Sequence, residues 1–211
     1  MKDVVVIPKA TVARLPLYFR VLNEYYHLNI TMLSSEEIAR KLDITSSQLR
    51  RDLSYFGDLG IRGAGYDVSF LLEKIKIILG MDKKRQLAVI GAGKIGTALA
   101  GYSGFKQHGL EVAALFEVNE TKLKDAKGPI PMYHISHLAK EKERLKMEIA
   151  VLTVPATVAQ EVADRVVEVG FKAIWNFVPL RLDVPEDVIV QYEDLVIGAL
   201  TLSHHLSRQE G

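Results

Sequence analysis

The chain has 211 residues, of which 48% are hydrophobic, and this suits a globular protein with one large domain or two modest ones. Its formal net charge of +1 excludes a bulk electrostatic attraction to nucleic acid or membrane, so any basic contact surface has to be local. The absence of cysteine excludes disulfides, thiolate catalysis and cysteine-based metal sites.

The start of the chain shows no targeting signal. Residues 1–4 do not open a signal-peptide pattern, and no apolar run approaches the roughly 20 residues that span a bilayer. We therefore expect the protein to stay in the cytoplasm.

Residues 1–80 are expected to form a helical unit. Pro8 and Pro16 each fit the first turn of a helix, and apolar residues then recur at helical spacing. Residues 34–37 offer a serine N-cap with glutamate three residues later, and residues 45–48 repeat this capping box with threonine and glutamine. Two short helices joined by so tight a turn predict a helix-turn-helix.

The second of these helices has two different faces. Leu49, Leu53 and Phe56 have the spacing i, i+4, i+7 and are expected to be buried. The opposite face suits the major groove of DNA, because arginine pairs with guanine while hydroxyl, amide and phenol groups reach phosphates or base edges. The predicted DNA contacts on this face are Ser47, Gln48, Arg50, Arg51, Ser54 and Tyr55. A merely solvated helix face is the alternative.

Residues 57–66 predict the wing of a winged helix. They form a glycine-punctuated hairpin with Arg62 near its tip, where it would enter the adjacent minor groove, in which negative potential concentrates. Residues 68–79 are typical of an amphipathic connecting helix. Residues 80–85 are the expected domain boundary, and their charges are most simply those of a solvated linker.

The stretch at residues 87–98 predicts a dinucleotide site, because a β-branched apolar run leads into Gly-x-Gly-x-x-Gly and then into an alanine-rich helix. Gly91 would permit the turn, Gly93 would admit the pyrophosphate, and Gly96 would let the helix pack on the strand. The phosphates would lie at the helix N-terminus. Glu117, about 20 residues later, would accept from the ribose hydroxyls and favour NAD(H) over NADP(H). A glycine-rich turn that binds nothing is the alternative.

Beyond this motif, alternating strands and helices predict a Rossmann-like parallel sheet with crossover helices. The predicted strands are residues 87–90, 110–116, 131–133, 147–153, 173–176 and 188–191, and the strongest later helix is 158–169. Ligands bind at the C-terminal ends of such strands, although ordinary turns are the alternative there. The predicted cofactor-binding residues are Gly91, Ala92, Gly93, Lys94, Ile95, Gly96, Glu117, Thr153, Val154, Pro155, Asn176, Phe177 and, as a pocket wall, Tyr102.

The last helix, after an N-cap at Asp194, is apolar on almost every side. Such a helix has to be buried all round, and insertion into a partner with reciprocal exchange would give a two-fold dimer. An ordinary terminal helix on its own sheet is the alternative. His204 and His205 are adjacent and do not share a helix face, so we expect no metal site.

The predicted fold class is therefore α/β, with three regions. Residues 1–80 form a winged helix-turn-helix domain for DNA, residues 81–192 form a Rossmann-like NAD(H)-binding domain, and residues 193–211 form a domain-swapped dimerisation helix.

An oxidoreductase is the main competing interpretation, because a glycine fingerprint is more often found in dehydrogenases. Lys94, His134 and His137 could then act as acid-base groups. Against it, no further region is large enough to bind a substrate, and no histidine or lysine follows a strand beside the nicotinamide position, so we predict no catalytic residue. A CoA- or nucleotide-binding interaction module would leave the winged helix unexplained.

Over essentially its full length the sequence resembles the Rex family of redox-sensing transcriptional repressors. The segments that carry the resemblance are residues 14–20, 48–57, 62–66, 91–96, 175–179 and 193–195. The resemblance implies a homodimer that binds a palindromic operator when NAD+ prevails and releases it when NADH rises. The family commonly has aspartate where this chain has Glu117 and a second acid where it has Asn119.

Motif positions imply the residue roles. Arg50, Arg51 and Tyr55 correspond to major-groove and phosphate contacts, and Arg62 corresponds to the minor-groove residue of the wing.

The same resemblance implies a polar switch made of Arg20, Tyr102 and Asp194. Our hypothesis is that NADH buries its ring near Tyr102 and Phe177 and releases Asp194 from Arg20. The two winged helices would then close to a spacing that misses successive major grooves.

Overall fold

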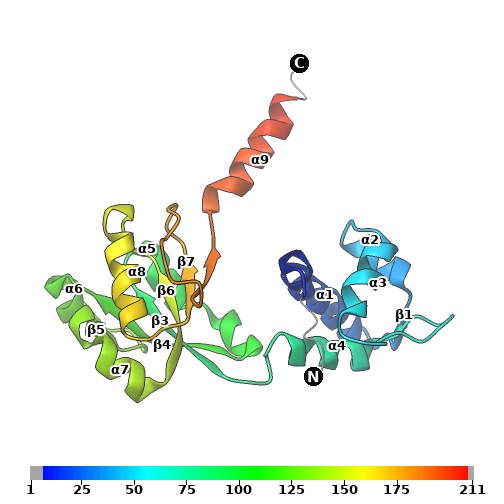
Figure 1. The fold of residues 1–211 in the computed structure, drawn as a ribbon, viewed down its shortest axis with the longest axis horizontal. Coiled ribbons are helices and arrows are strands. Elements are labelled where there is room, and N and C mark those ends of the chain that lie inside the picture. Colours follow the sequence, from blue (N-terminus) through cyan, green and yellow to red (C-terminus); the bar gives the residue numbers. More distant parts are fainter. Residues whose placement is uncertain (1–6, 209–211) are drawn as a thin grey trace. The chain divides into compact units, whose positions relative to one another are not determined.

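The computed structural model describes residues 7–208. Residues 1–6 and 209–211, which include the start of the chain and the outer ends of the first and third predicted regions, lie outside the described residues. The chain divides into two compact units between Lys83 and Lys84 (Figure 1).

The first unit is helical with a small antiparallel sheet. Its apolar faces meet in one core, which includes Leu15, Leu22, Ile38, Leu49 and Ile75. Strand β1 pairs with β2 through Met32↔Asp67 and Leu33↔Tyr66. The elements are α1 (Lys9–His27), β1 (Met32–Leu33), α2 (Ser35–Lys41), α3 (Ser46–Ser54), β2 (Tyr66–Asp67) and α4 (Val68–Ile78).

Helix α1 begins directly after Pro8, close to the predicted place, and it corrects the prediction that Pro16 lies in the first turn of a helix. Pro8 is the N-cap, and Pro16 lies inside one continuous helix. A proline inside a helix removes the hydrogen bond to the carbonyl four residues earlier, here that of Val12. Val12 is 45% exposed, so water can reach this side of the helix and hydrate the freed carbonyl, while Leu15 and Leu22 still hold the opposite side in the core.

The predicted helix-turn-helix is present in α2 and α3. The Ser34 side chain accepts from the amide of Glu37 and the Glu37 side chain returns a bond to the Ser34 amide, so this capping box is confirmed. The second box is only half right. Thr45 accepts from the Gln48 amide at 3.1 Å, but the Gln48 side chain donates to Asp52 instead of reaching back.

The predicted wing is also present. Ile61 and Gly65 form an antiparallel bridge, with the Ile61 amide donating to the Gly65 carbonyl at 2.6 Å and the Gly65 amide donating back at 3.0 Å. A side chain at Gly65 would meet the Leu33 carbonyl oxygen at 2.3 Å, and the residue has a φ of +99°. Glycine at this position lets the base of the wing pass close to β1.

The second unit contains a six-stranded sheet in the order β5-β4-β3-β6-β7-β8. Each pair of neighbouring strands is parallel. All six predicted strands are confirmed, with ends that differ by at most two residues. They are β3 (Arg85–Ile90), β4 (Leu110–Glu117), β5 (Met132–His134), β6 (Met147–Leu152), β7 (Ala173–Asn176) and β8 (Ile189–Tyr192).

This order is that of a doubly wound fold: the chain starts at the central strand β3, moves outward through β4 and β5, and then crosses to β6 on the other side. Helices and short 3-10 turns make the crossovers. They are α5 (Lys94–Ala100), η1 (Ser103–His108), α6 (Glu120–Asp125), η2 (Ile135–His137), α7 (Leu138–Leu145), η3 (Ala156–Val158) and α8 (Ala159–Glu168).

Both faces of the central strands of this sheet are buried. Ala88 and Ile90 point into a core that contains residues of α7 and α8. Leu87 and Val89 point into a second core with residues that follow the glycine motif. Because alternate residues of β3 face opposite sides, its buried part, residues 87–90, has to be apolar throughout, as the sequence indicated.

The last helix is α9 (Leu195–Ser207), and Asp194 caps it by accepting from the Val196 amide at 2.8 Å. None of its described residues is buried, and Leu195, Leu200 and Leu202 are each more than 60% exposed. Its insertion into a partner stays a prediction. Among the helices of residues 7–208, none is long and apolar enough to cross a membrane.

Candidate functional site

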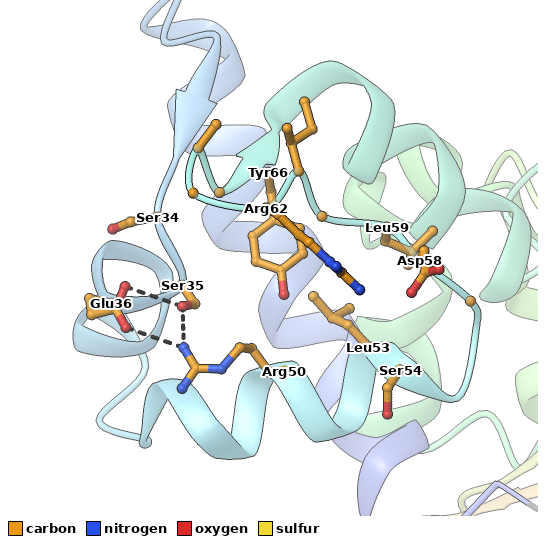
Figure 2. Close-up of a pocket in the computed structure, with 16 residues that line it drawn as sticks. Ser34, Ser35, Glu36, Arg50, Leu53, Ser54, Asp58, Leu59, Arg62 and Tyr66 are labelled. Atoms are coloured by element: carbon orange, nitrogen blue, oxygen red, sulfur yellow. Dashed lines mark hydrogen bonds and ion pairs between the residues drawn. The ribbon is translucent and has the colours of Figure 1, made fainter.

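In the first unit, a surface hollow of about 510 Å³ lies between α3 and the wing (Figure 2). Arg50 Nη1 donates to Ser35 Oγ at 2.7 Å and to a Glu36 carboxylate oxygen at 3.2 Å. Arg50 is therefore held by hydrogen bonds to α2, whereas Arg62 extends from the wing over the hollow (Figure 2).

Arg51 and Arg62 differ from Arg50. Both are exposed, and in the described part of the chain neither guanidinium has a hydrogen-bond or ion-pair partner. The first unit thus includes two exposed cations without internal partners among the described residues, one on α3 and one at the tip of the wing. Because the net charge of the chain is only +1, phosphate binding would depend on such local cations.

The other predicted DNA contacts have internal partners or partial burial. Ser47 lies 3.4 Å from Arg50 Nη2, and Ser54 Oγ donates to the Arg51 carbonyl at 2.7 Å. Gln48 and Tyr55 are half-buried. Of these four residues, Ser54 lines the hollow, and contact of any of them with DNA stays a prediction.

Asp52, on the buried side of α3, is a structural residue that the sequence analysis missed. It is 1% exposed, and its carboxylate holds α1 against α3. Its donors are Thr11 Oγ1 at 2.9 Å, Arg14 Nε at 2.6 Å and Nη2 at 2.8 Å, Tyr18 Oη at 2.5 Å and Gln48 Nε2 at 2.9 Å. The sequence does not show that Thr11, Arg14 and Tyr18, which lie 34 to 41 residues earlier, are partners of this aspartate, and only the folded chain brings them together.

The electrostatics of Asp52 follow from these contacts. Burial acts to raise its pKa, but the hydrogen bonds, first of all those from Arg14 and Tyr18, outweigh it and lower the pKa from 3.8 to about 2. Burial and the neighbouring Asp52 raise the pKa of Tyr18. The hydrogen bond to Asp52 raises the pKa of Arg14, so this group stays a charged pair.

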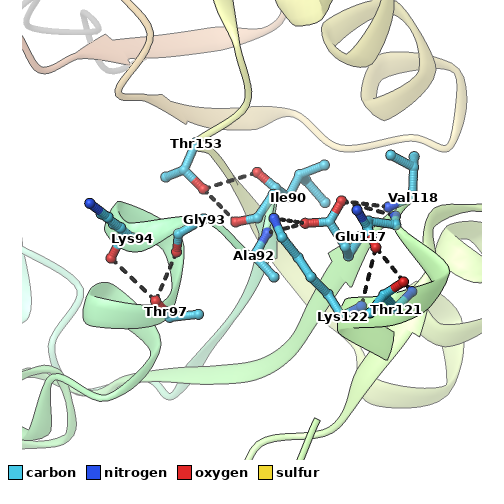
Figure 3. A network of polar contacts seen from close by, with 12 residues as sticks. Ile90, Ala92, Gly93, Lys94, Thr97, Glu117, Val118, Thr121, Lys122 and Thr153 are labelled. Carbon is cyan, nitrogen blue, oxygen red and sulfur yellow. Dashed lines mark hydrogen bonds and ion pairs between the residues drawn. The ribbon is translucent and has the colours of Figure 1, made fainter. Parts of the chain in front are cut away.

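In the second unit, the glycine motif forms a tight loop between β3 and α5 (Figure 3). Gly91 has a φ of +100°, and a Cβ there would meet the Thr153 carbonyl oxygen at 2.8 Å. Thr153 Oγ1 donates to the carbonyls of Ile90 and Gly91, at 3.1 and 2.8 Å. The loop is thus packed tightly against the end of β6.

The other two glycines differ in their surroundings. A Cβ on Gly96 would lie 2.0 Å from the Gly91 carbonyl oxygen, so Gly96 is required where α5 crosses the loop. A Cβ on Gly93 would meet no atom of the described residues within 4 Å. The structure therefore shows a turn at Gly91, close packing at Gly96 and an open face at Gly93, and pyrophosphate contact at that face stays a prediction.

Glu117 ends β4 beside this loop and is 8% exposed (Figure 3). It accepts from the amides of Val118 and Ala92 at 2.8 and 3.2 Å, from the amide of Asn119 at 3.2 Å, and from Lys122 Nζ at 3.0 Å. Burial acts to raise its pKa, but the bonds from Lys122 and from the amides outweigh it, so its pKa lies below the ordinary value.

A cavity of about 650 Å³ opens at the C-terminal ends of β3, β4 and β6. This is the switch point of the sheet, where dinucleotides bind in doubly wound folds. Of the predicted residues, the cavity brings together Gly91, Gly93, Glu117, Thr153, Val154 and Pro155, and it adds Lys122, Val158, Glu161 and Arg165, which the sequence analysis did not single out.

The residues predicted near the nicotinamide are organised differently. Asn176 is fully buried, with Nδ2 donating to the carbonyls of Val178 and Leu180 and Oδ1 accepting from the Val178 amide. Its side chain thus builds the turn after β7. Phe177 contacts Trp175 with ring centroids 4.8 Å apart, and Tyr102 is 61% exposed.

The residues of the predicted polar switch lie in different units. Arg20 is exposed on α1 of the first unit, whereas Tyr102 and Asp194 belong to the second. Their association stays a prediction. Among residues 7–208, no group of three or more histidine, aspartate or glutamate side chains could hold a metal ion.

Comparisons with known proteins address the whole chain. Residues 82–180 match a family model described as a CoA binding domain, and residues 6–54 match one described as a putative DNA-binding protein N-terminus. A redox-sensing transcriptional repressor Rex from Levilactobacillus brevis is 42% identical over 95% of this chain and 94% of its own. The Rex repressor of Chloroflexus aurantiacus is 37% identical over 96% of both chains.

The chain belongs to the Rex family of redox-sensing transcriptional repressors. Crystal structures of RSP, a Rex-family repressor, have the same fold. RSP with NAD+ and operator DNA superposes with a TM-score of 0.91 at 36% identity, covering 97% of this chain and 94% of RSP. RSP with NADH gives a TM-score of 0.89 at 35% identity, covering 97% and 96%. The predicted α/β class, a winged helix-turn-helix followed by a Rossmann-like sheet, is confirmed.

Proposed function

We propose that this Rex-family protein is a homodimer that represses transcription from a palindromic operator and leaves the DNA when NADH binds. One observation carries the proposal: the same chain contains a winged helix-turn-helix and a cavity large enough for part of a dinucleotide. In the winged helix-turn-helix, Arg51 and Arg62 have no internal partner among the described residues. RSP binds the corresponding ligands, NAD+ with operator DNA and NADH, and we carry them over to this chain.

The cleft fits NAD(H). Gly93 leaves the loop open where a pyrophosphate would approach the amides at the start of α5. Glu117 lies where an acidic side chain accepts from ribose hydroxyls. The apolar side chains of Val154, Val158 and Val162 also line the cavity, and they suit an adenine ring.

The two redox forms have to be distinguished by contacts at the nicotinamide ring. The reduced ring is neutral and the oxidised ring is cationic, and only a differential contact with the ring can bias two arrangements of the dimer. Tyr102 and Phe177 would enclose the neutral ring, the α9 helices would shift in the dimer, and Asp194 would separate from Arg20. Moving the dimer from mostly open to mostly closed takes on the order of 5 kcal/mol of differential binding.

We propose that the dinucleotide cavity serves regulation rather than catalysis. The named relatives are transcriptional repressors. His134 ends β5 on the β4 side of the sheet, and its Nδ1 is 2.7 Å from Ser136 Oγ. Asn176 and Phe177, two of the residues that we expect near the nicotinamide, lie at the end of β7 on the other side of β3. We expect no turnover of NADH by the purified protein with small hydroxy or keto acids, and measurable steady-state oxidation would favour the oxidoreductase.

A CoA-binding interaction module is the second candidate, favoured by the family model that matches residues 82–180. CoA and NADH both contain an adenosine diphosphate group, so CoA could compete for the part of the cavity that would bind adenosine. We expect NADH, and not CoA, to release operator DNA. Because its proposed ligands are operator DNA and NAD(H), we also propose that the protein acts in the cytoplasm.

The deciding experiment is fluorescence anisotropy of a labelled palindromic operator with the full-length protein. NADH and NAD+ are titrated separately at fixed salt, because phosphate contacts make the affinity depend on salt. Tight binding that NADH abolishes and NAD+ leaves intact supports the repressor. No operator binding, with NADH still bound, favours the enzyme or the interaction module.

A further inference from the structure

The hydrogen bonds of Glu117 leave little room for a ribose. One carboxylate oxygen accepts from the Val118 and Asn119 amides, and the other accepts from the Ala92 amide and from Lys122 Nζ. A carboxylate offers about four acceptor positions, so the four contacts within the described chain occupy them. For Glu117 to accept from ribose hydroxyls, at least one of these donors has to move away.

Lys122 is the donor that can move. The amides of Ala92, Val118 and Asn119 belong to the backbone at the ends of β3 and β4, and their positions are set by the sheet. Among the described residues, Lys122 is the single side-chain donor to Glu117, and its side chain is 48% exposed. A lysine side chain is flexible and strongly hydrated, so it can move into solvent when ribose hydroxyls replace its hydrogen bond to the carboxylate.

Lys122 also faces the place where the ligand would bind. It lines the same cavity as Gly93 and Glu117. Its backbone is held at the start of α6, where Asn119 Oδ1 accepts from the Lys122 amide at 3.2 Å. A lysine that leaves Glu117 therefore stays beside the ribose position.

We propose that Lys122 is a specificity-determining residue that sets how sharply the site distinguishes an unphosphorylated from a 2′-phosphorylated adenosine ribose. Glu117 repels a 2′-phosphate, whereas the displaced ammonium of Lys122 attracts it and offsets part of that repulsion. The chain thus rejects NADPH less strongly than Glu117 alone would. This inference rests on the proposed binding of NAD(H).

Two other charged residues on α8, Glu161 and Arg165, line the same cavity. Arg165 is not among the donors to Glu117 in the described structure. It is the competing candidate for a phosphate partner, so the experiment has to separate it from Lys122.

The test measures the dissociation constants of NADH and NADPH for the full-length protein, the second by competition so that weak binding is still quantified. The readout is the ratio of the two constants within each variant, because a general loss of stability affects both ligands alike. Lys122→Met should raise the ratio of NADPH to NADH about tenfold, the effect of one charge-assisted hydrogen bond. Glu117→Gln should lower the ratio.

Two variants serve as matched controls. Lys122→Arg keeps the charge, and Lys124→Met removes one charge from the same helix at a residue outside the cavity lining. Both should keep the ratio within about twofold of the unsubstituted protein, because neither removes the cation beside the ribose.

Three results would overturn the proposal. In the first, Lys122→Met weakens the binding of both ligands by the same factor, which would indicate that Lys122 has a purely structural role. In the second, the ratio responds to Arg165→Met and not to Lys122→Met. In the third, the unsubstituted protein excludes NADPH as completely as Lys122→Met does. Failure of the unsubstituted protein to bind NADH at all is a different result, since it counts against the proposed function itself.

Discussion

Asp52 shows how one buried residue can join two helices of a small domain. Its carboxylate accepts from Arg14 and Tyr18 on α1 while sitting on α3, the helix that would contact DNA. Removing one partner of a buried charge pair costs about 3 to 5 kcal/mol, because the other charge is left without compensation. The position of α3 against α1 therefore depends on this ionised carboxylate.

We predict that Asp52→Asn lowers the free energy of unfolding by about 3 kcal/mol at neutral pH. The pKa of Asp52 is lowered on folding, so its contribution is present above the ordinary value of 3.8 and is lost as the pH falls through about 2. The difference between the variant and the unsubstituted protein should therefore shrink between about pH 4 and pH 2. Urea denaturation at several pH values measures it, with the exposed Asp58→Asn as control, and a pH-independent difference would contradict the argument.

The glycines of the nucleotide loop allow folding and binding to be separated. Gly96→Ala would place a methyl group 2.0 Å from a backbone oxygen, and we predict a loss of stability of several kcal/mol. Gly93→Ala meets open space within the described residues, so it should fold with unchanged stability and yet bind NADH at least tenfold more weakly. Thermal unfolding and NADH titration of both variants check this, and normal NADH affinity in Gly93→Ala would show that no phosphate approaches that face.

Some residue roles could be predicted from the sequence and others could not. The roles of Gly91 and Gly96 follow from spacing within one loop, and so they were predictable. Lys122 could have been suspected, because it follows the Asn119 cap at the third helical position. The bonds from α1 to Asp52 could not, because they depend on where side chains 34 to 41 residues apart meet after folding.

Among the elements, the apolar pattern predicted the central strands β3, β4 and β6 because burial on both faces makes most of their residues apolar. It predicted α4 and α8 for the complementary reason, a single buried stripe. The prediction failed at Pro16, where the local rule for proline was outweighed by the buried contacts of Leu15, Tyr18 and Leu22 along one helix. Local signals are thus weakest where packing on one face can compensate for a lost hydrogen bond.

The wing is the element that most directly tests the DNA interface. Arg62 is exposed at its tip and has no internal partner among the residues described. We predict that Arg62→Ala weakens operator binding about tenfold and reduces the slope of log affinity against log salt by about 1. Arg62→Lys should keep the slope, because the charge remains, and recover only part of the affinity. An unchanged slope in Arg62→Ala would place Arg62 away from the phosphates.

In the molecule as a whole, α9 is the helix whose apolar surface is not buried within a single chain. It exposes Leu195, Ile197 and Leu200 by 60% or more, which a stable monomer rarely tolerates over a whole helix. Asp194 stands where this helix begins, directly after Glu193, whose side chain accepts from Trp175 beside Phe177. A change at the proposed nicotinamide position therefore has a short path of contacts to the start of α9.

Coupling between NADH and operator DNA has to be reciprocal, so each ligand weakens the other by the same factor. We predict that Asp194→Ala reduces this factor about tenfold or more, while NADH affinity without DNA changes by less than threefold. Since Asp194 also caps α9 through the Val196 amide, Asp194→Asn is the matched control: it keeps the cap and removes the charge.

If the charge of Asp194 forms the switch with Arg20, Asp194→Asn loses the coupling as Asp194→Ala does. Arg20→Ala then loses the coupling too, and combining it with Asp194→Asn causes no further loss. If the cap alone matters, Asp194→Asn behaves like the unsubstituted protein and Asp194→Ala weakens both NADH binding and dimerisation. Equal loss of NADH affinity and of the NADH response in both variants would remove Asp194 from the switch. Operator anisotropy with and without NADH, and NADH titration with and without operator, give both sides of the cycle.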